Sequence, residues 1–240
     1  MSAFFSIAGV SKRFRGLVAV DRASCEVAQG EIFAVIGPNG AGKTTLFNMI
    51  AGSLKPDEGE IAFAGERIDG LRPDEVCRRG IARTFQIVRP FPALTVEDNI
   101  MVGALLRTSD TAQARTTAHE VMRKLDLFDK RARPAKSLTL PDRKRLEVAR
   151  ALATSPQLLL LDEVMAGLRP TETDRIVAIL RELNAQGLTI LLIEHVMRAV
   201  MALATQVLVL HHGAPIALGK PADVVREPAV ISSYLGAEAL

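Results

Sequence analysis

Gly37-Pro38-Asn39-Gly40-Ala41-Gly42-Lys43-Thr44 is the stretch of this 240-residue chain that decides its fold. It matches the pattern G-x-x-x-x-G-K-[ST], and it stands between the apolar run Glu31–Ile36 and a helical pattern that begins at Thr44. Glycines let consecutive backbone N–H groups curl around an anion, and the N-terminus of the following helix adds positive potential. The segment therefore predicts a phosphate-binding turn between a buried strand and a helix.

The residue types in this turn suit a nucleotide with a phosphate tail. Lys43 can place a mobile charge on the β- and γ-phosphates, and the Thr44 hydroxyl can ligate Mg²⁺. A glycine turn with a purely structural role is the alternative, and the flanking strand and helix disfavour it. We therefore assign the nucleotide contacts to Gly37 through Thr44 and to Thr45, the next residue.

Two acids follow a second apolar run. In Leu158-Leu-Leu-Leu161-Asp162-Glu163, both carboxylates come directly after a predicted strand, at the edge where open α/β sheets bind ligands. Asp162 can hold the shell of a Mg²⁺ ion, and Glu163 can orient or deprotonate a water for attack on the γ-phosphate. Two acids in this position also suit a helix N-terminus, but the upstream glycine turn favours the catalytic interpretation.

The rest of the chain predicts an α/β fold. Short apolar runs without alternation indicate strands buried on both faces, and a helix is expected over Thr171–Gln186. The predicted buried strands are Ile32–Ile36, Leu158–Leu161, Leu188–Ile193 and Val207–Leu210. An antiparallel portion is expected near the N-terminus, at Ile7–Val10, Ala19–Val27 and Glu60–Phe63. His211-His212-Gly213 predicts a hairpin turn.

Between Thr95 and Thr154 the pattern contains helices only, and Thr95-Val-Glu-Asp98 resembles a capping box. We therefore expect a P-loop nucleotide-binding domain over residues 1–240, with an N-terminal antiparallel β portion and an inserted helical subdomain. The α/β core is predicted over residues 1–86 and 156–240, and the helical subdomain over residues 87–155.

Composition excludes several other classes of protein. The longest apolar stretch, Ala199–Leu210, is shorter than the roughly 20 residues that a membrane span needs. Cys25 and Cys77 form no Cys-x-x-Cys pair, so the sequence predicts a reduced, cytoplasmic protein without a disulfide framework or a zinc site. A net charge of +3 is too small to indicate a nucleic-acid partner.

Positive charge is concentrated between Arg107 and Arg150, which hold 12 basic and 6 acidic residues. Two interpretations stay open at this stage. The segment is either a solvated helical surface or a face turned toward an anionic membrane or a protein partner.

Together with further residues in the same order, these motifs make the chain resemble the ATP-binding cassette (ABC) ATPases over nearly its whole length. Phe14, 23 residues before Gly37, matches the aromatic residue that stacks on adenine in that family, although a core phenylalanine is the alternative. Gln86 matches the glutamine that senses Mg²⁺ and water. His195, after the predicted strand, matches the switch histidine near the γ-phosphate. His119, His211 and His212 match no family position and are interpreted as surface or turn residues.

The resemblance implies ATP and Mg²⁺ as cofactors. Thr44, Gln86 and Asp162 would ligate the metal, the acid through water. Glu163 would assist in-line attack by water, while Lys43 and His195 stabilise the developing charge.

The stretch Arg83–Ile100 is similar, more specifically, to importers of branched-chain amino acids and related amides. In those systems two different ATPase chains pair beneath two membrane permease subunits, which an external solute-binding protein supplies. The resemblance therefore implies an ATPase subunit of an importer, peripheral on the inner face of the cell membrane, in a heterodimer or a homodimer. The alternatives are a soluble cassette of a non-transport assembly, a DNA-repair or ribosome-acting cassette, and a lipid-exporter cassette. Co-purified membrane subunits would distinguish transport from the soluble alternative.

The chain departs from the family in its signature loop, Leu-Ser-Gly-Gly-Gln, which reaches across to the ATP of the other chain. The aligned residues are Leu138-Thr139-Leu140-Pro141-Asp142. Thr139 keeps a hydroxyl for the nucleotide, but Leu140 adds a Cβ, Pro141 has no N–H, and Asp142 adds negative charge. Thr139 can instead serve as the N-cap of a helix whose first turn contains Pro141 and Asp142.

A second departure follows Glu163. Val164 replaces the usual proline, and the loop Ala166-Gly-Leu-Arg169 carries arginine where an acid is common. We expect an asymmetric pair in which the site built on Lys43 and Glu163 hydrolyses ATP, while the site completed by residues 138–142 turns ATP over slowly.

Overall fold

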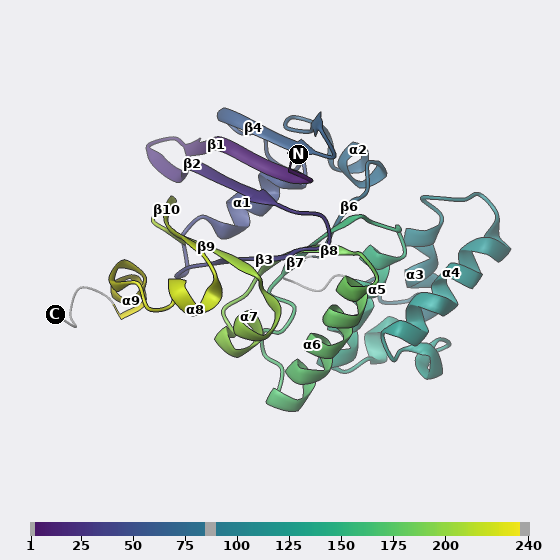
Figure 1. Ribbon diagram of the computed structural model, residues 1–240. Helices are drawn as coiled ribbons and strands as arrows, with labels where there is room; N and C mark the ends of the chain where they lie inside the picture. The colour runs from purple at the N-terminus through teal and green to yellow at the C-terminus, as the bar shows by residue number, and fades with distance from the viewer. Residues whose placement is uncertain (1–2, 85–89, 236–240) are drawn as a thin grey trace.

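The computed structural model describes residues 3–84 and 90–235, in which two β-sheets enclose a helix and further helices cover the outer face of the larger sheet (Figure 1). The larger sheet has the strand order β10-β9-β3-β8-β7-β6. Its strands are β3 (Ile32–Ile36), β6 (Ile81–Arg83), β7 (Leu158–Asp162), β8 (Thr189–Ile193), β9 (Gln206–His211) and β10 (Ala214–Gly219).

The centre of this sheet is parallel and buried on both faces. β3 pairs in parallel with β8 and β9, and β7 pairs in parallel with β6 and β8. Every residue of β3, β7 and β8 is buried, as predicted from apolar runs in which polar residues do not alternate. Because parallel strands end at the same edge, the segments that follow β3, β7 and β8 meet there.

The smaller sheet is antiparallel and has the strand order β2-β1-β4-β5. Its strands are β1 (Phe5–Phe14), β2 (Leu17–Val27), β4 (Glu58–Phe63) and β5 (Glu66–Arg67). Helix α1 (Lys43–Ile50) lies between the two sheets and buries Leu46, Phe47, Met49 and Ile50 in the core that they share (Figure 1). The expected N-terminal antiparallel portion is thereby confirmed.

The remaining helices surround the larger sheet. The strand residues that face away from α1 form a second core with α3, α4, α5, α6 and α7. The helices are α2 (Pro73–Arg78), α3 (Val96–Ala104), α4 (Thr111–Lys124), α5 (Leu140–Leu152), α6 (Pro170–Ala185), α7 (Met197–Leu203), α8 (Pro221–Val224) and α9 (Pro228–Leu235), with 3₁₀ turns at Phe128–Lys130 and Ala135–Ser137. None of the helices in the described part of the chain has the length and apolar character needed to cross a bilayer.

Between β6 and β7 the described residues contain helices, 3₁₀ turns and a single isolated bridge, from Thr95 to Pro134. Thr95 caps α3 as expected, because its hydroxyl accepts a hydrogen bond from the backbone N–H of Asp98. Asn99, fully buried on α3, binds both the N–H and the C=O of Phe91 and the C=O of Thr95. The division of the chain into a core and a helical subdomain at residues 87 and 155 stays a prediction.

α3 and α5 pack so closely that their contact leaves no space for a side chain. A Cβ on Gly103 of α3 would lie 2.4 Å from the carbonyl oxygen of Arg150 and 3.2 Å from the Cβ of Ala153. The close packing of these two helices therefore requires glycine at residue 103.

We predict that Gly103→Ala lowers the free energy of unfolding by about 1–3 kcal/mol, because the added methyl group forces α3 away from α5. Helix propensity alone would act in the opposite direction by about 1 kcal/mol. Urea unfolding of both proteins measures the difference. Gly16→Ala is the matched control, since a Cβ at that residue has no atom within 4 Å. Equal or higher stability of the Gly103 variant would contradict the predicted clash.

Candidate nucleotide-binding and catalytic site

The turn between β3 and α1 requires glycine at two positions, because at each of them a neighbouring strand lies too close for a side chain. Gly37 and Gly42 have φ of 145° and 101°, in the region that side chains disfavour. A Cβ on Gly37 would lie 2.1 Å from the carbonyl oxygen of Leu210, and one on Gly42 would lie 2.2 Å from that of Ala19. The backbones of strands β9 and β2 thus lie close against the turn and restrict its conformation.

Lys43 is the first residue of α1, and its side chain bends back over the turn. Its Nζ donates hydrogen bonds to the carbonyl oxygens of Gly37, at 2.7 Å, and of Pro38, at 2.9 Å. Burial lowers the pKa of this ammonium, while the carboxylates of Glu163 and Asp162 act in the opposite direction. The loop therefore holds a positive charge against its own carbonyl groups, where a phosphate can replace them as a partner.

A cleft of about 410 Å³ lies over this turn. It is lined by Phe14, the turn and first helical residues 39–45, and Glu163. Phe14 is 43% exposed, which is compatible with stacking on a base and not with a core role. The structure thus brings most of the predicted nucleotide contacts together in one cleft.

His212 also lines the cleft, although the sequence pattern indicates only a turn residue. The predicted hairpin turn between β9 and β10 is confirmed, and His212 adopts φ of 48° within it. The next residue, Gly213, donates its N–H to the carbonyl oxygen of Ala41. No motif or spacing signals this contact, because the hairpin reaches the glycine turn only in the folded chain.

Asp162, the last residue of β7, is 1% exposed. Its Oδ2 accepts a hydrogen bond from Arg83 at 2.9 Å, and its Oδ1 has no partner among the described residues. Burial raises the pKa of this carboxyl, and the Arg83 guanidinium opposes that effect. Arg83 also donates to Asn48 on α1 at 2.5 Å, so it ties β6, β7 and α1 together. A carboxylate with one oxygen paired and the other unpaired suits a hydrated divalent cation.

Glu163 follows Asp162, and His195 follows β8, so the two lie at the same edge of the sheet. The Glu163 Oε1 is 3.8 Å from the His195 Nδ1. The side chain of Glu163 is 16% exposed and that of His195 is 54% exposed. A largely buried acid and a half-exposed imidazole therefore lie together at the edge of the sheet that carries the Lys43 turn.

The predicted contacts also include Gln86 and Thr139. Gln86 falls outside the described residues. Thr139 is the N-cap of α5 and does not line the cleft. α5 begins at Leu140, so the altered signature residues form a first helical turn, as their sequence permits. The sequence also suggests that the Thr139 side chain caps the helix, but its hydroxyl donates to the Asp142 Oδ2 at 2.9 Å and makes no cap hydrogen bond.

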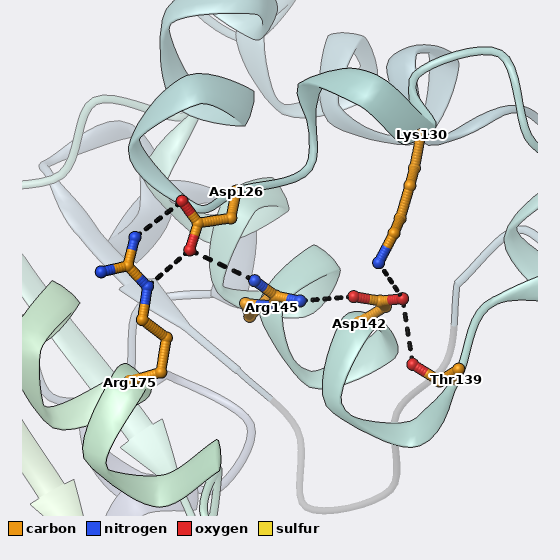
Figure 2. Close-up of polar contacts among 6 residues, drawn as sticks. All are labelled: Asp126, Lys130, Thr139, Asp142, Arg145 and Arg175. Atoms are coloured by element: carbon orange, nitrogen blue, oxygen red, sulfur yellow. Dashed lines mark hydrogen bonds and ion pairs between the residues drawn. The ribbon is translucent and has the colours of Figure 1, made fainter. Parts of the chain in front are cut away.

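Asp142 is 3% exposed and is neutralised within the chain (Figure 2). Its two carboxylate oxygens accept from Lys130 and from Arg145, each at 2.5 Å. Burial acts to raise the pKa of Asp142, but the hydrogen bonds from Lys130 and Thr139 outweigh it and hold the pKa below its usual value. The negative charge that the sequence places at this turn is therefore balanced by neighbours on the same chain.

The same network reaches α6. Asp126, two residues beyond the end of α4, accepts from Arg175 of α6 at 2.6 and 2.7 Å and lies 3.4 Å from Arg145 (Figure 2). Arg145 therefore joins two carboxylates, and the network fixes the start of α5 against both α4 and α6. Lys130 and Arg145, two of the cations in the basic segment 107–150, are therefore paired with acids of the same chain.

Two family profiles match the chain. The profile described as ABC transporter matches residues 20–166, and that described as branched-chain amino acid ATP-binding cassette transporter matches residues 214–239. The first match spans more than half of the chain.

Individual proteins and structures agree with these profiles. The high-affinity branched-chain amino acid transport ATP-binding protein LivG of Salmonella typhimurium is 38% identical, over 96% of this chain and 97% of that protein. The corresponding protein BraF of Pseudomonas aeruginosa is 37% identical, over 96% of each. A crystal structure of the ADP conformation of an ATP-binding cassette of an ABC transporter superimposes with a TM-score of 0.90 at 31% identity, covering 98% of this chain and 100% of that one. The chain therefore belongs to the ABC transporter family and is one of its ATP-binding cassettes, an ATPase subunit related to those of branched-chain amino acid transporters.

Proposed function

We propose that this chain hydrolyses ATP to drive import of branched-chain amino acids or related amides through separate membrane subunits. The observation that carries the proposal is the meeting of the Lys43 turn with Glu163 and His195 at one edge of the sheet. The similarity to LivG and BraF supports the solute class.

The described residues support a division of tasks in the cleft. Phe14 stacks on the base, and the backbone amides of residues 37–45 surround the phosphates. Lys43 exchanges its two carbonyl partners for β- and γ-phosphate oxygens. Glu163 orients a water for in-line attack and His195 stabilises charge on the γ-phosphate.

Mg²⁺ would be held by Thr44 and, through water, by Asp162, whose Oδ1 is unpaired among the described residues. Gln86 completes this proposed set on the strength of the family resemblance alone. When bound, the ion neutralises charge between the β- and γ-phosphates.

The partners proposed from the resemblance are a second ABC ATPase chain, two permease subunits and, indirectly, an external solute-binding protein, with no nucleic acid. The chain would lie in the cytoplasm, peripheral on the inner face of the cell membrane. Helical residues 87–155 would form the subdomain that transmits closure to the permeases, with residues 1–86 and 156–240 as the core.

We also propose that the pair is asymmetric. The Thr139 hydroxyl is engaged by Asp142, and the nearby cations Lys130 and Arg145 are engaged by the same carboxylate (Figure 2). Pro141 lacks an N–H for an anion. Few hydrogen-bond donors of this loop are therefore available to the γ-phosphate of an ATP bound by the partner chain. The site that the loop completes would accordingly turn ATP over slowly.

Two alternative functions are less well supported. A soluble cassette of a non-transport assembly would use the same cleft, and co-purification of the chain with permease subunits separates the two. A lipid-exporter cassette fits less well, because the segment 214–239 matches the profile of branched-chain amino acid cassettes.

We predict that Lys43→Ala weakens ATP binding by at least about a hundredfold, since the phosphate-binding turn loses its lysine charge; this corresponds to about 2.7 kcal/mol. Isothermal titration calorimetry with ATP and Mg²⁺ measures the change. Lys220→Ala, at the N-cap of α8, should leave the affinity unaltered. Unchanged affinity of the Lys43 variant would remove the argument for the phosphate turn.

A second prediction concerns the asymmetry of the assembled pair. Glu163→Gln in this chain should lower steady-state ATPase activity by at least about tenfold, while the matching change in the partner chain should lower it less than about twofold. Wild-type and singly substituted pairs are compared at saturating ATP. An equal loss from the two substitutions would refute the asymmetry.

A further inference from the structure

Glu163 has a backbone conformation that a side-chain-bearing residue rarely adopts. Its φ is 50°, in the left-handed region, and it is followed by a turn in which Ala166 donates its N–H to the Glu163 carbonyl oxygen at 3.2 Å. Such a conformation persists only where the surroundings hold it, and it is most common at functional sites. The orientation of the Glu163 carboxylate therefore depends on whatever holds this turn.

One holding contact comes from α5. Lys144 is only 6% exposed, and its Nζ donates a hydrogen bond to the Glu163 carbonyl oxygen at 2.9 Å. Lys144 lies two residues after Asp142, on the helix that begins at the altered signature residues. A buried ammonium is costly unless it is bonded, so this contact is expected to be strongly maintained.

The second holding contact comes from the end of β8. Glu194 is 1% exposed, and its Oε1 accepts a hydrogen bond from the backbone N–H of Met165 at 2.8 Å. Its Oε2 has no hydrogen-bond partner within the part of the chain that the structure describes. Burial raises the pKa of this carboxyl, against the hydrogen bond from the Met165 amide and the charge of His195. In either protonation state the carboxyl group keeps an oxygen that can accept from the Met165 N–H.

Glu194 directly precedes His195, so one residue connects the Glu163 turn to the histidine beside it. The backbone adds a third link, because the Glu163 N–H donates to the carbonyl oxygen of Ile193 at 3.0 Å. The turn is thus attached to Ile193 at the end of β8, to Glu194 directly after it, and to Lys144 of α5.

We propose that Lys144 and Glu194 are positioning residues that hold the turn Glu163–Met165 in its strained conformation and so place the Glu163 carboxylate beside His195. Neither side chain contacts the reacting atoms, and both act through the backbone. This inference rests on the proposed ATPase function, which it deepens. It also makes α5 a direct mechanical link between the altered signature turn and the catalytic acid.

The test uses three substitutions to the same apolar residue in the chain assembled with its partner. Lys144→Met and Glu194→Met each remove one holding contact with little change in length. Arg181→Met is the control, since Arg181 also donates to a backbone carbonyl, that of Ala202, and neither residue lines the cleft. Glu194→Gln keeps an acceptor for Met165 and serves as the conservative variant.

We expect Lys144→Met and Glu194→Met to lower kcat by at least about tenfold while KM and ATP affinity change less than about twofold. Glu194→Gln and Arg181→Met should keep kcat within about threefold of wild type. In a Glu163→Gln background, neither Met substitution should lower the residual rate further, because the group that they position is gone. Thermal unfolding of each variant separates these effects from loss of the fold.

Amide hydrogen exchange gives a readout that does not depend on hydrolysis. The Met165 amide should exchange at least about tenfold faster in Glu194→Met and remain protected in Glu194→Gln and Arg181→Met.

A folded Glu194→Met or Lys144→Met protein with wild-type kcat would overturn the proposal, as would an undiminished effect in the Glu163→Gln background or an unchanged Met165 exchange rate in Glu194→Met. If Glu194→Met fails to fold, Lys144→Met decides by the same criteria. A wild-type pair without ATPase activity would refute the proposed function instead, and the exchange comparison would still decide whether Glu194 holds the turn.

Discussion

β3, β7 and β8 are buried on both faces, and they run in parallel through the middle of the larger sheet. That arrangement brings their carboxyl ends to one edge. The phosphate-binding turn, the two acids and His195 follow these three ends and meet without any sequence proximity. The helices on the outer face and α1 on the inner face complete the burial, so the chemistry of the cleft depends on the packing of both cores.

Charge in this chain is handled in two different ways. Around the cleft, Lys43 and Asp162 are buried, and their hydrogen bonds leave each of them able to bind a further charged group. Lys43 binds two carbonyl oxygens, and Asp162 binds the guanidinium of Arg83 through one carboxylate oxygen. Around the altered signature turn, the acid Asp142 is fully engaged by Lys130, Arg145 and Thr139 (Figure 2). The charged groups at the cleft can therefore still bind a charged ligand, whereas those at the altered signature turn already bind one another. This contrast is the physical basis for the asymmetry that we propose.

Much of the fold and of the nucleotide cleft could be predicted, because both depend on local patterns. The buried strands, the N-terminal antiparallel portion, the hairpin turn at His211–Gly213 and the cap at Thr95 follow from periodicity and turn chemistry over a few residues. Arg83, His212, Lys144 and Glu194 could not be recognised in the same way. An arginine in a short strand or a glutamate before a histidine has no pattern of its own, and each acquires its task from a neighbour distant in the chain. Thr139 is an intermediate case, since its position at the start of α5 was predictable and the direction of its hydrogen bond was not.

The sequence by itself determined the backbone of the phosphate-binding turn, the two acids after a buried strand and the identity of the family, because glycine conformations, apolar runs and motif spacing act over short distances. Only the tertiary structure decided which groups share the cleft and which contact the turn that follows Glu163. Asp162 meets an arginine 79 residues away, and the turn after Glu163 is held by a carboxyl 29 residues from Met165. Such contacts arise from the order in which strands pair and from the helices that cover them, since this arrangement sets which buried polar groups must satisfy one another.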